Sequence, residues 1–181
     1  MKITKTNLKD CFVLEPKVYE DERGYFMESF NQKRFLQTTD INIEFIQDNE
    51  SKSSKGVLRG LHFQTGDFAQ TKLVRVIKGR VQDVVVDLRP GSLTYGHHFS
   101  IELSETNKKQ LFIPKDFAHG FLVLENETIF NYKCDNYYHP ESENGIHYND
   151  KDLNIDWMLP KEKLIISEKD AKLPLFKAYS K

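Results

Sequence analysis

The middle of the chain alternates hydrophobic and polar residues with the two-residue period of β-strands. β-branched runs cover residues 72–77 and 80–88, and the Lys78-Gly79 pair between them predicts a tight hairpin. Shorter apolar runs follow at close spacing over residues 99–103, 111–113, 120–124 and 129–134. Many short strands at such intervals favour an antiparallel sandwich or barrel over alternating strands and helices.

Helical patterns are few. Residues 32–37 are one candidate, and the charged tail after Pro160 is a place for a short helix. No repeat, low-complexity tract or linker divides the chain, so we predict a single domain over residues 1–181. Residues 1–50 are expected to add strands and part of a site, 51–140 to form the core barrel, and 141–181 to close the site.

Composition narrows the classes of function. Of 181 residues, 39% are hydrophobic and 29% charged, which is typical of a soluble globular domain with a sizeable core. The 26 basic and 27 acidic residues give a net charge of −1, so no basic surface is expected to hold nucleic acid or an anionic membrane. Any phosphate must therefore be bound by individually placed Arg and Lys side chains.

Targeting and redox signals are sparse. The N-terminus lacks an apolar signal core, and no run approaches the roughly 18 apolar residues of a membrane span. The two cysteines, Cys11 and Cys134, form no CxxC motif. We expect both to be reduced, in a cytoplasmic protein.

The richest stretch is KGVLRGLHFQ at residues 55–64, which puts charged and polar side chains on an apolar strand. Glycines bracket Arg59, and glycine inside a strand often marks a close approach of backbone or ligand. The two-residue period places Gly60, His62 and Gln64 on one face. Such a face indicates the lining of a site, and a solvated outer face is the alternative.

The spacing of the histidines indicates whether the chain could form a metal centre. A metal-binding cupin barrel needs a His-x-His pair on one strand, a carboxylate and a distant histidine. Here the near pair is His97-His98, whose side chains point to opposite faces of a strand, and His62 has Gln64 where the second ligand would stand. His119 occupies the place of the last ligand. The pattern predicts a cupin-like frame whose metal-binding set is incomplete.

Acid–base chemistry is the remaining interpretation. His62 is the natural base, because an imidazole titrates near neutral pH. Lys72 lies on an apolar strand and would stabilise an oxyanion if it faced a cavity. Tyr132 suits a proton donor, although an aromatic core residue with a satisfied hydroxyl would look the same. Asp170 taken alone is typical of a solvated charge or a cap.

Several blocks of sequence occur together along nearly the whole chain. They are residues 21–26, 47–49, 56–62, 83–89, 113–121 and 167–170. In this order they resemble the dTDP-4-dehydrorhamnose 3,5-epimerases of deoxysugar synthesis. The resemblance implies an all-β, cupin-like jelly-roll barrel with a few short helices, and a homodimer that exchanges N-terminal strands. One departure is Asp116, which stands where the family has glycine and must take a backbone shape that few L-residues adopt.

The resemblance also implies roles for residues. His62 matches the base, Asp170 the carboxylate that orients it, Lys72 the group that holds the enolate oxygen, and Tyr132 the acid on the other face. The implied substrate-binding positions, some of them reaching the site from a partner subunit, are Arg23, Phe26, Glu28, Gln47, Asn49, Arg59, His119, Tyr138, Glu143 and Lys169.

The implied reaction inverts C3 and C5 of dTDP-4-dehydro-6-deoxy-D-glucose through an enolate, giving dTDP-4-dehydro-L-rhamnose without redox cofactor or metal. Three alternatives stay open from the sequence. The chain could epimerise a single carbon, C3 or C5, of a related nucleotide 4-keto sugar. It could bind sugars without catalysis, or it could be a metal-dependent cupin.

Overall fold

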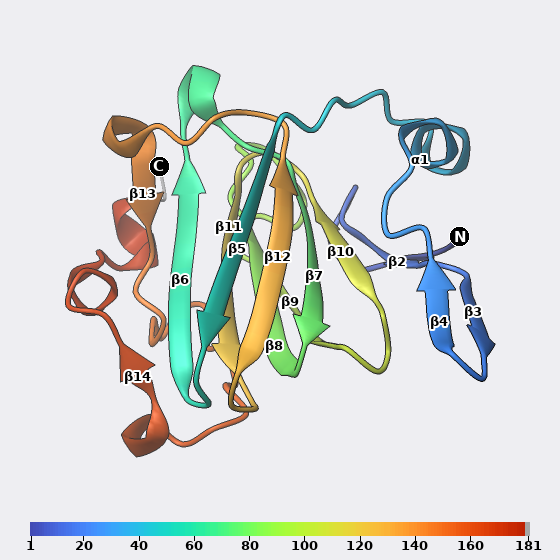
Figure 1. Cartoon of the computed structure of the whole chain (residues 1–181). Helices are drawn as coiled ribbons and strands as arrows, with labels where there is room; N and C mark the ends of the chain where they lie inside the picture. Colours follow the sequence, from blue (N-terminus) through green and yellow to red (C-terminus); the bar gives the residue numbers. More distant parts are fainter. Residues whose placement is uncertain (180–181) are drawn as a thin grey trace.

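The computed structural model describes residues 1–179 and contains two large β-sheets that face each other (Figure 1). The first sheet has the order β1 (Lys2–Lys5), β2 (Phe12–Glu15), β10 (Gln110–Ile113), β7 (Lys72–Lys78), β12 (Thr128–Cys134) and β5 (Gln47–Ser53). The second has the order β13 (Glu143–Gly145), β6 (Val57–Gln64), β11 (Phe117–Val123), β8 (Arg80–Asp87) and β9 (His98–Ser104), with β14 (Ile165–Ile166) beside β6. This arrangement confirms the predicted all-β, cupin-like fold.

Smaller elements lie around the sheets. β3 (Val18–Asp21) and β4 (Gly24–Met27) pair as a separate hairpin, drawn at the right of Figure 1 below α1 (Gln32–Thr39). α1 confirms the predicted helix, and the Asn31 side chain caps it by accepting a hydrogen bond from the Arg34 amide. The short helix predicted in the tail after Pro160 is replaced by 3-10 turns, of which Lys161–Lys163 is the first. The other 3-10 turns are Gly66–Phe68, Pro140–Ser142, Asp170–Lys172 and Phe176–Ala178.

The core lies between the inner faces of the two sheets. Val74, Leu111 and Phe130 from the first sheet meet Val81 and Val85 from the second, all 0–1% exposed. The opposite face of the second sheet is buried too, under the C-terminal segment. β8 is therefore covered on both faces, which explains its uninterrupted run of valines.

The predicted hairpin at Lys78-Gly79 is wrong. β7 and β8 belong to different sheets, and Gly79 carries the chain from one sheet to the other. Gly79 has a φ of 79°, and a Cβ there would lie 2.3 Å from Oγ1 of Thr128. A hairpin and a crossing between sheets both use glycine at the bend, so the local signal did not distinguish them. What decided the path was pairing of β8 with β9 and β11.

β6 and β11 approach very closely where their register shifts. His119 pairs with His62, but Phe121 pairs with Arg59, so β6 carries one extra residue at Gly60-Leu61, opposite Gly120. A Cβ on Gly60 would lie 2.6 Å from the carbonyl oxygen of His119. The close approach predicted at Gly60 is thus confirmed. The irregularity also lets Arg59 and His62, three residues apart, line the same cavity.

Two further predictions concern single residues. Asp116 has a φ of 61°, which confirms the unusual backbone shape expected at the turn before β11. Cys11 and Cys134 are both free and buried. Among residues 1–179, no helix is long and apolar enough to cross a bilayer.

Candidate active site

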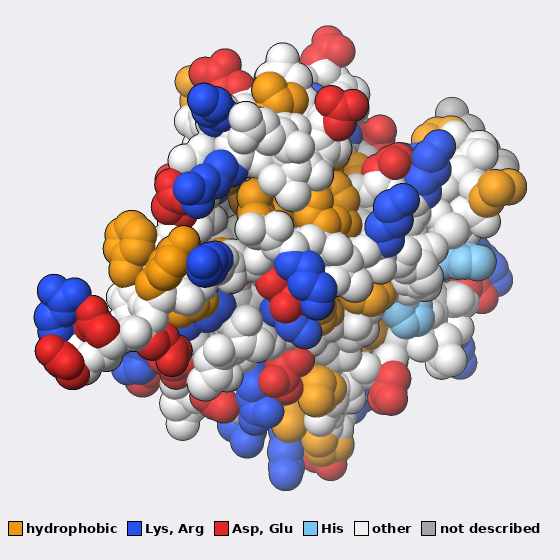
Figure 2. All heavy atoms as spheres, turned by 90° about the vertical axis from the view of Figure 1, so that its right-hand side faces the viewer, with side chains coloured by type: hydrophobic (Ala, Val, Ile, Leu, Met, Phe, Trp, Pro, Cys, Tyr) orange, Lys and Arg blue, Asp and Glu red, His pale blue; other side chains and the backbone are white. Residues whose placement is uncertain are grey.

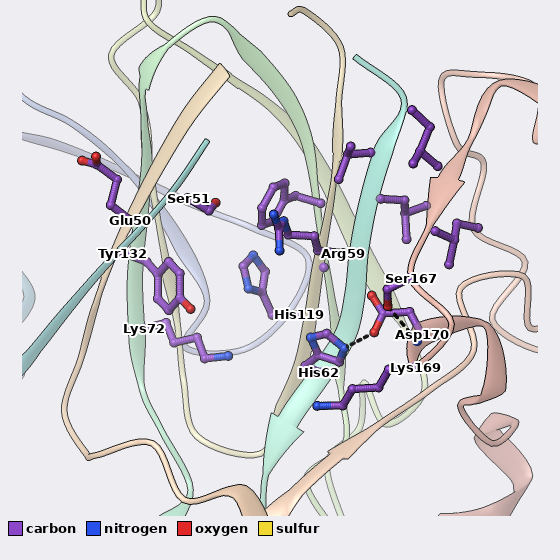
Figure 3. Close-up of a pocket in the computed structure, with 16 residues that line it drawn as sticks. Glu50, Ser51, Arg59, His62, Lys72, His119, Tyr132, Ser167, Lys169 and Asp170 are labelled. Carbon is purple, nitrogen blue, oxygen red and sulfur yellow. Dashed lines mark hydrogen bonds and ion pairs between the residues drawn. The ribbon is translucent and has the colours of Figure 1, made fainter. Parts of the chain in front are cut away.

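A cavity of about 510 Å³ opens between the two sheets, beside the C-terminal segment (Figure 3). Tyr132 and Lys72 enter it from the first sheet, and His62, Arg59 and His119 enter from the second. The C-terminal segment adds Ser167, Lys169 and Asp170. The structure therefore brings together the four predicted catalytic residues and three of the predicted substrate-binding residues.

His62 and Asp170 form a pair across 108 positions of sequence. Nε2 of His62 lies 2.8 Å from Oδ1 of Asp170, and the Gly60 amide donates a 3.2 Å hydrogen bond to Oδ2 of Asp170. Burial would raise the pKa of Asp170, but the hydrogen bond and charge of His62 and the Gly60 amide outweigh it and hold that pKa below its usual value. The ionised carboxylate orients the imidazole and leaves Nδ1 as the nitrogen available to a substrate.

Tyr132 and Lys72 project from neighbouring strands of the opposite sheet. Nζ of Lys72 lies 6.0 Å from the centre of the Tyr132 ring. Burial raises the pKa of Tyr132 to about 12, so this hydroxyl keeps its proton at neutral pH. Burial lowers the pKa of Lys72, while nearby acidic groups, Glu143 and Asp83 among them, oppose that shift. The arrangement places a proton donor and a cation across the cavity from the imidazole.

A second histidine–carboxylate pair lies deeper. Nε2 of His119 is 2.9 Å from Oδ2 of Asp83, whose side chain is fully buried. Arg59 is held differently, since its Nη2 donates a 3.2 Å hydrogen bond to Oγ of Ser53 on β5. The two histidines of the cavity are thus paired with separate carboxylates. Across residues 1–179, no three His, Cys, Asp or Glu side chains are placed to hold a metal ion.

The remaining predicted residues of this region form a hydrogen-bonded row outside the cavity. The hydroxyl of Tyr138 donates to Oε2 of Glu143 over 2.8 Å, and Lys169 donates to the same oxygen. Burial would raise the pKa of Glu143, but these two hydrogen bonds and the charge of His62 keep it low. Gln47 accepts from the Tyr138 amide and donates to Asn49, each over 3.0 Å.

The last three predicted binding residues lie away from the cavity altogether within this chain. Arg23 and Phe26 lie on the β3–β4 hairpin, and Glu28 follows β4. Arg23 pairs with Asp21, Glu28 pairs with Arg34, and the Phe26 ring is 66% exposed. Their distance from β6 is plain in Figure 1.

Sequence reasoning missed other residues of the cavity wall. Ser51 has a buried hydroxyl oxygen without a hydrogen-bond partner, and the two-residue spacing from Gln47 and Asn49 on β5 would have indicated it. Ile165, Ile166 and Ser167 carry no local signal, because they reach the cavity only through the parallel pairing of β14 with β6. Gln64, predicted to share the site face, is buried at the end of β6 and bonds to loops instead.

Comparison with known proteins identifies the family. A family model described as dTDP-4-dehydrorhamnose 3,5-epimerase matches residues 5–178. The chain belongs to this family. A member from Escherichia coli K12, named dTDP-4-dehydrorhamnose 3,5-epimerase, is 52% identical over 173 residues, which are 96% of this chain and 93% of that protein.

Solved structures of the family superpose closely. The enzyme from Elizabethkingia anophelis is 55% identical, with a TM-score of 0.94, over 98% of this chain and 97% of that one. An epimerase from Legionella pneumophila, solved in complex with dTDP-4-keto-L-rhamnose, is 50% identical, with a TM-score of 0.93, over 97% of this chain and 93% of that one.

Proposed function

We propose that this chain inverts C3 and C5 of dTDP-4-dehydro-6-deoxy-D-glucose and so produces dTDP-4-dehydro-L-rhamnose. The observation that carries the proposal is a cavity with a carboxylate-oriented base on one wall and a protonated tyrosine beside a lysine on the other. The names of the relatives and the sugar nucleotide bound to the Legionella enzyme support the same reaction.

The chemistry follows from the ketone at C4, which acidifies the hydrogens on C3 and C5. His62 removes one of these protons, and Asp170 stabilises the imidazolium that forms. The Lys72 ammonium stabilises the enolate oxygen as its charge develops. Tyr132 then returns a proton to the opposite face of the carbon, which inverts it. The sequence of steps is redox-neutral, so it requires no redox cofactor.

Binding roles follow from charge and shape. Arg59 and Lys169 suit the diphosphate, because guanidinium and ammonium groups form charge-assisted hydrogen bonds with its oxygens. His119 would contact the sugar, and Tyr138 would stack on the base beside Glu143. Gln47 and Asn49 would complete the nucleotide site.

We propose that the functional unit is a homodimer, in which Arg23, Phe26 and Glu28 reach the cavity of the partner subunit. β5 ends its sheet and pairs only with β12 among the described strands, so one of its edges is open to another strand. The β3–β4 hairpin exposes Tyr19, Tyr25 and Phe26. Figure 2, which views this side of the molecule, shows hydrophobic side chains at the surface between charged ones.

A cytoplasmic location is also proposed, in keeping with the two free buried thiols. A single-carbon epimerase is the second candidate, because one base and one acid serve either carbon and the shape of the cavity selects between them. Incubation with dTDP-4-dehydro-6-deoxy-D-glucose in deuterated water, followed by NMR, separates these possibilities.

Deuterium at both C3 and C5 of an inverted product is the expected result. Deuterium at one carbon alone would replace the double epimerase with the single-carbon enzyme. No exchange at either carbon would contradict catalysis and favour a sugar-binding protein. Activity that disappears with chelator and returns with metal would indicate the metal-dependent alternative.

A further inference from the structure

Gln64 is a buried amide at the end of β6, two residues after His62, and is 4% exposed. Its Nε2 donates hydrogen bonds to the carbonyl oxygens of Phe68, over 2.7 Å, and Tyr137, over 3.1 Å. Its Oε1 accepts a 2.7 Å hydrogen bond from the His139 amide. One side chain therefore joins β6 to the 66–68 turn and to both residues that flank Tyr138.

Other contacts join the same two loops. The rings of Phe68 and His139 stack with their centres 3.6 Å apart and their planes at 8°. Nδ2 of Asn136 donates a 2.8 Å hydrogen bond to the carbonyl oxygen of Asp67. The Tyr138 ring itself is 52% exposed, so packing gives it little fixed orientation. Its direction depends on the backbone at 137–139 and on the hydrogen bond from its hydroxyl to Glu143.

We infer that Gln64 is a positioning residue that holds the backbone on both sides of Tyr138, so that the tyrosine ring is ready to stack on the nucleotide base. The inference rests on the proposed function, in which Tyr138 contacts that base. A ring held in its binding orientation loses less conformational freedom when the ligand arrives. If the loop occupied its competent arrangement only a tenth of the time, the apparent Kd would rise about tenfold.

The chain contains a matched control for this role. Gln82 on β8 is 3% exposed and, like Gln64, donates two hydrogen bonds and accepts one. Its Nε2 donates to Oγ of Ser100 over 3.0 Å and to the carbonyl oxygen of Asp156 over 2.8 Å, and its Oε1 accepts from the Met158 amide over 2.8 Å. Gln82 does not line the cavity. Gln64→Met and Gln82→Met therefore each remove three buried hydrogen bonds, one set next to the Tyr138 loop and the other set away from the cavity.

The test is titration calorimetry with dTDP, combined with melting temperatures and steady-state kinetics, on the unmodified chain and both variants. Both variants should lower the melting temperature by similar amounts. Only Gln64→Met should raise the Kd for dTDP, by about tenfold, with a matching rise in KM and a kcat within about twofold of the unmodified enzyme. Equal dTDP affinity in Gln64→Met and Gln82→Met would overturn the inference and leave the proposed function intact. Failure of the unmodified chain to bind dTDP would overturn the proposed function first.

A double variant identifies the residue through which Gln64 acts. In a Tyr138→Ala background, Gln64→Met should weaken dTDP binding no further, because the ring that Gln64 positions is gone. Independent, additive losses would refute the link to Tyr138. Should Gln64→Met not fold, Gln64→Glu keeps the shape and the acceptor for the His139 amide but loses at least one of the two donors. Gln64→Glu should also raise KM while kcat changes little, and an unchanged KM in that variant would also refute the role.

Discussion

At the scale of single residues, the site depends on pairs rather than isolated groups. Asp170 orients His62 through a hydrogen bond. Asp170 is held in turn by the Gly60 amide, which donates to its carboxylate, and by its own backbone amide, which donates to the Ser167 hydroxyl. The carboxylate side chain is 6% exposed, whereas that of His62 is 27% exposed and faces the cavity. An imidazole fixed from the buried side can present one nitrogen to both carbons that flank the C4 ketone of the proposed substrate.

We expect His62→Ala and Asp170→Asn each to lower kcat by about 10²–10⁴-fold while dTDP affinity changes little. The two residues act as one unit, so the double variant should be scarcely slower than His62→Ala. Steady-state kinetics on the three variants measure this. If the increases in activation free energy of the two single variants added up in the double variant, Asp170 would not act through His62.

Tyr132→Phe isolates the acid. The variant keeps the ring packing and removes only the hydroxyl, so His62 should still exchange hydrogen at a carbon beside the ketone in deuterated water, while inversion fails. NMR should then show deuterated sugar of mostly unchanged configuration. If the Tyr132 hydroxyl served only the structure, Tyr132→Phe should epimerise normally and lose about 0.5–1.5 kcal/mol of stability. Full activity in Tyr132→Phe would remove the acid assignment.

At the scale of elements, the site depends on how closely β6 and β11 can approach. A Cβ at Gly60 would lie 2.6 Å from the His119 carbonyl oxygen, and one at Gly120 would lie 2.7 Å from that of Arg59. This contact allows Arg59 and His62 to enter one cavity and brings His119 opposite His62. Strand geometry, rather than loop chemistry, therefore sets the spacing of the cavity wall.

Gly60→Ala should destabilise the protein by about 3 kcal/mol or more, because the methyl group meets backbone that cannot move independently. Gly91→Ala is the control. Gly91 has a positive φ of 76°, compared with 110° at Gly60, but nothing lies within 4 Å of its Cβ position, so Gly91→Ala should lower the free energy of unfolding by about 1 kcal/mol. Urea denaturation of both variants gives the comparison. Equal losses would mean that backbone conformation, not close approach, explains Gly60.

Asp87, at the end of β8, shows how one buried carboxylate organises the turn that follows. It accepts hydrogen bonds from the amide and guanidinium of Arg89 and from the hydroxyls of Ser92 and Thr94. Burial alone would raise the pKa of Asp87, but these bonds lower it from 3.8 to about 2. A lowered carboxyl pKa stabilises the fold above pH 4 by about 2 kcal/mol, and this contribution disappears as pH falls from about 4 to 2.

Asp87→Asn should therefore lower the free energy of unfolding more at pH 7 than at pH 3. Denaturation at several pH values measures the difference between the variant and the unmodified chain. Asp21→Asn is the control, since Asp21 pairs with Arg23 at the exposed hairpin and should change stability little. If Asp87→Asn lowered the free energy of unfolding by the same amount at every pH, the lowered pKa of Asp87 would not contribute to stability.

At the scale of the whole molecule, the proposed dimer means that one chain would contain only part of its own site. Arg23, Phe26 and Glu28 lie away from the cavity, while the open edge of β5 lies beside it. A second copy that laid its hairpin along β5 would complete both sites at once, and it would cover the exposed aromatic side chains of the hairpin.

Light scattering should therefore give a dimer at micromolar concentration, and complementation should show the shared site. Phe26→Ala and His62→Ala should each lose activity, yet their co-expression should restore about a quarter of the sites, because a mixed dimer has one site with both halves intact. If each site were contained within one chain, co-expression would restore no activity. A monomer in solution would also refute the shared site.

The sequence by itself determined the strand-rich fold, the helix α1 and the close approach at Gly60, and the family resemblance added the unusual backbone of Asp116. These properties follow from local alternation, capping and steric restriction, which act over a few residues. Together with the family resemblance, it also pointed to the residues that the cavity brings together. The tertiary structure decided the rest: the sheet change at Gly79, the place of Ile165 and Ile166, and the loops that Gln64 holds. Asp170 reaches His62 across 108 positions because pairing between sheet edges and burial of the C-terminal segment, not any nearby residue, bring them together.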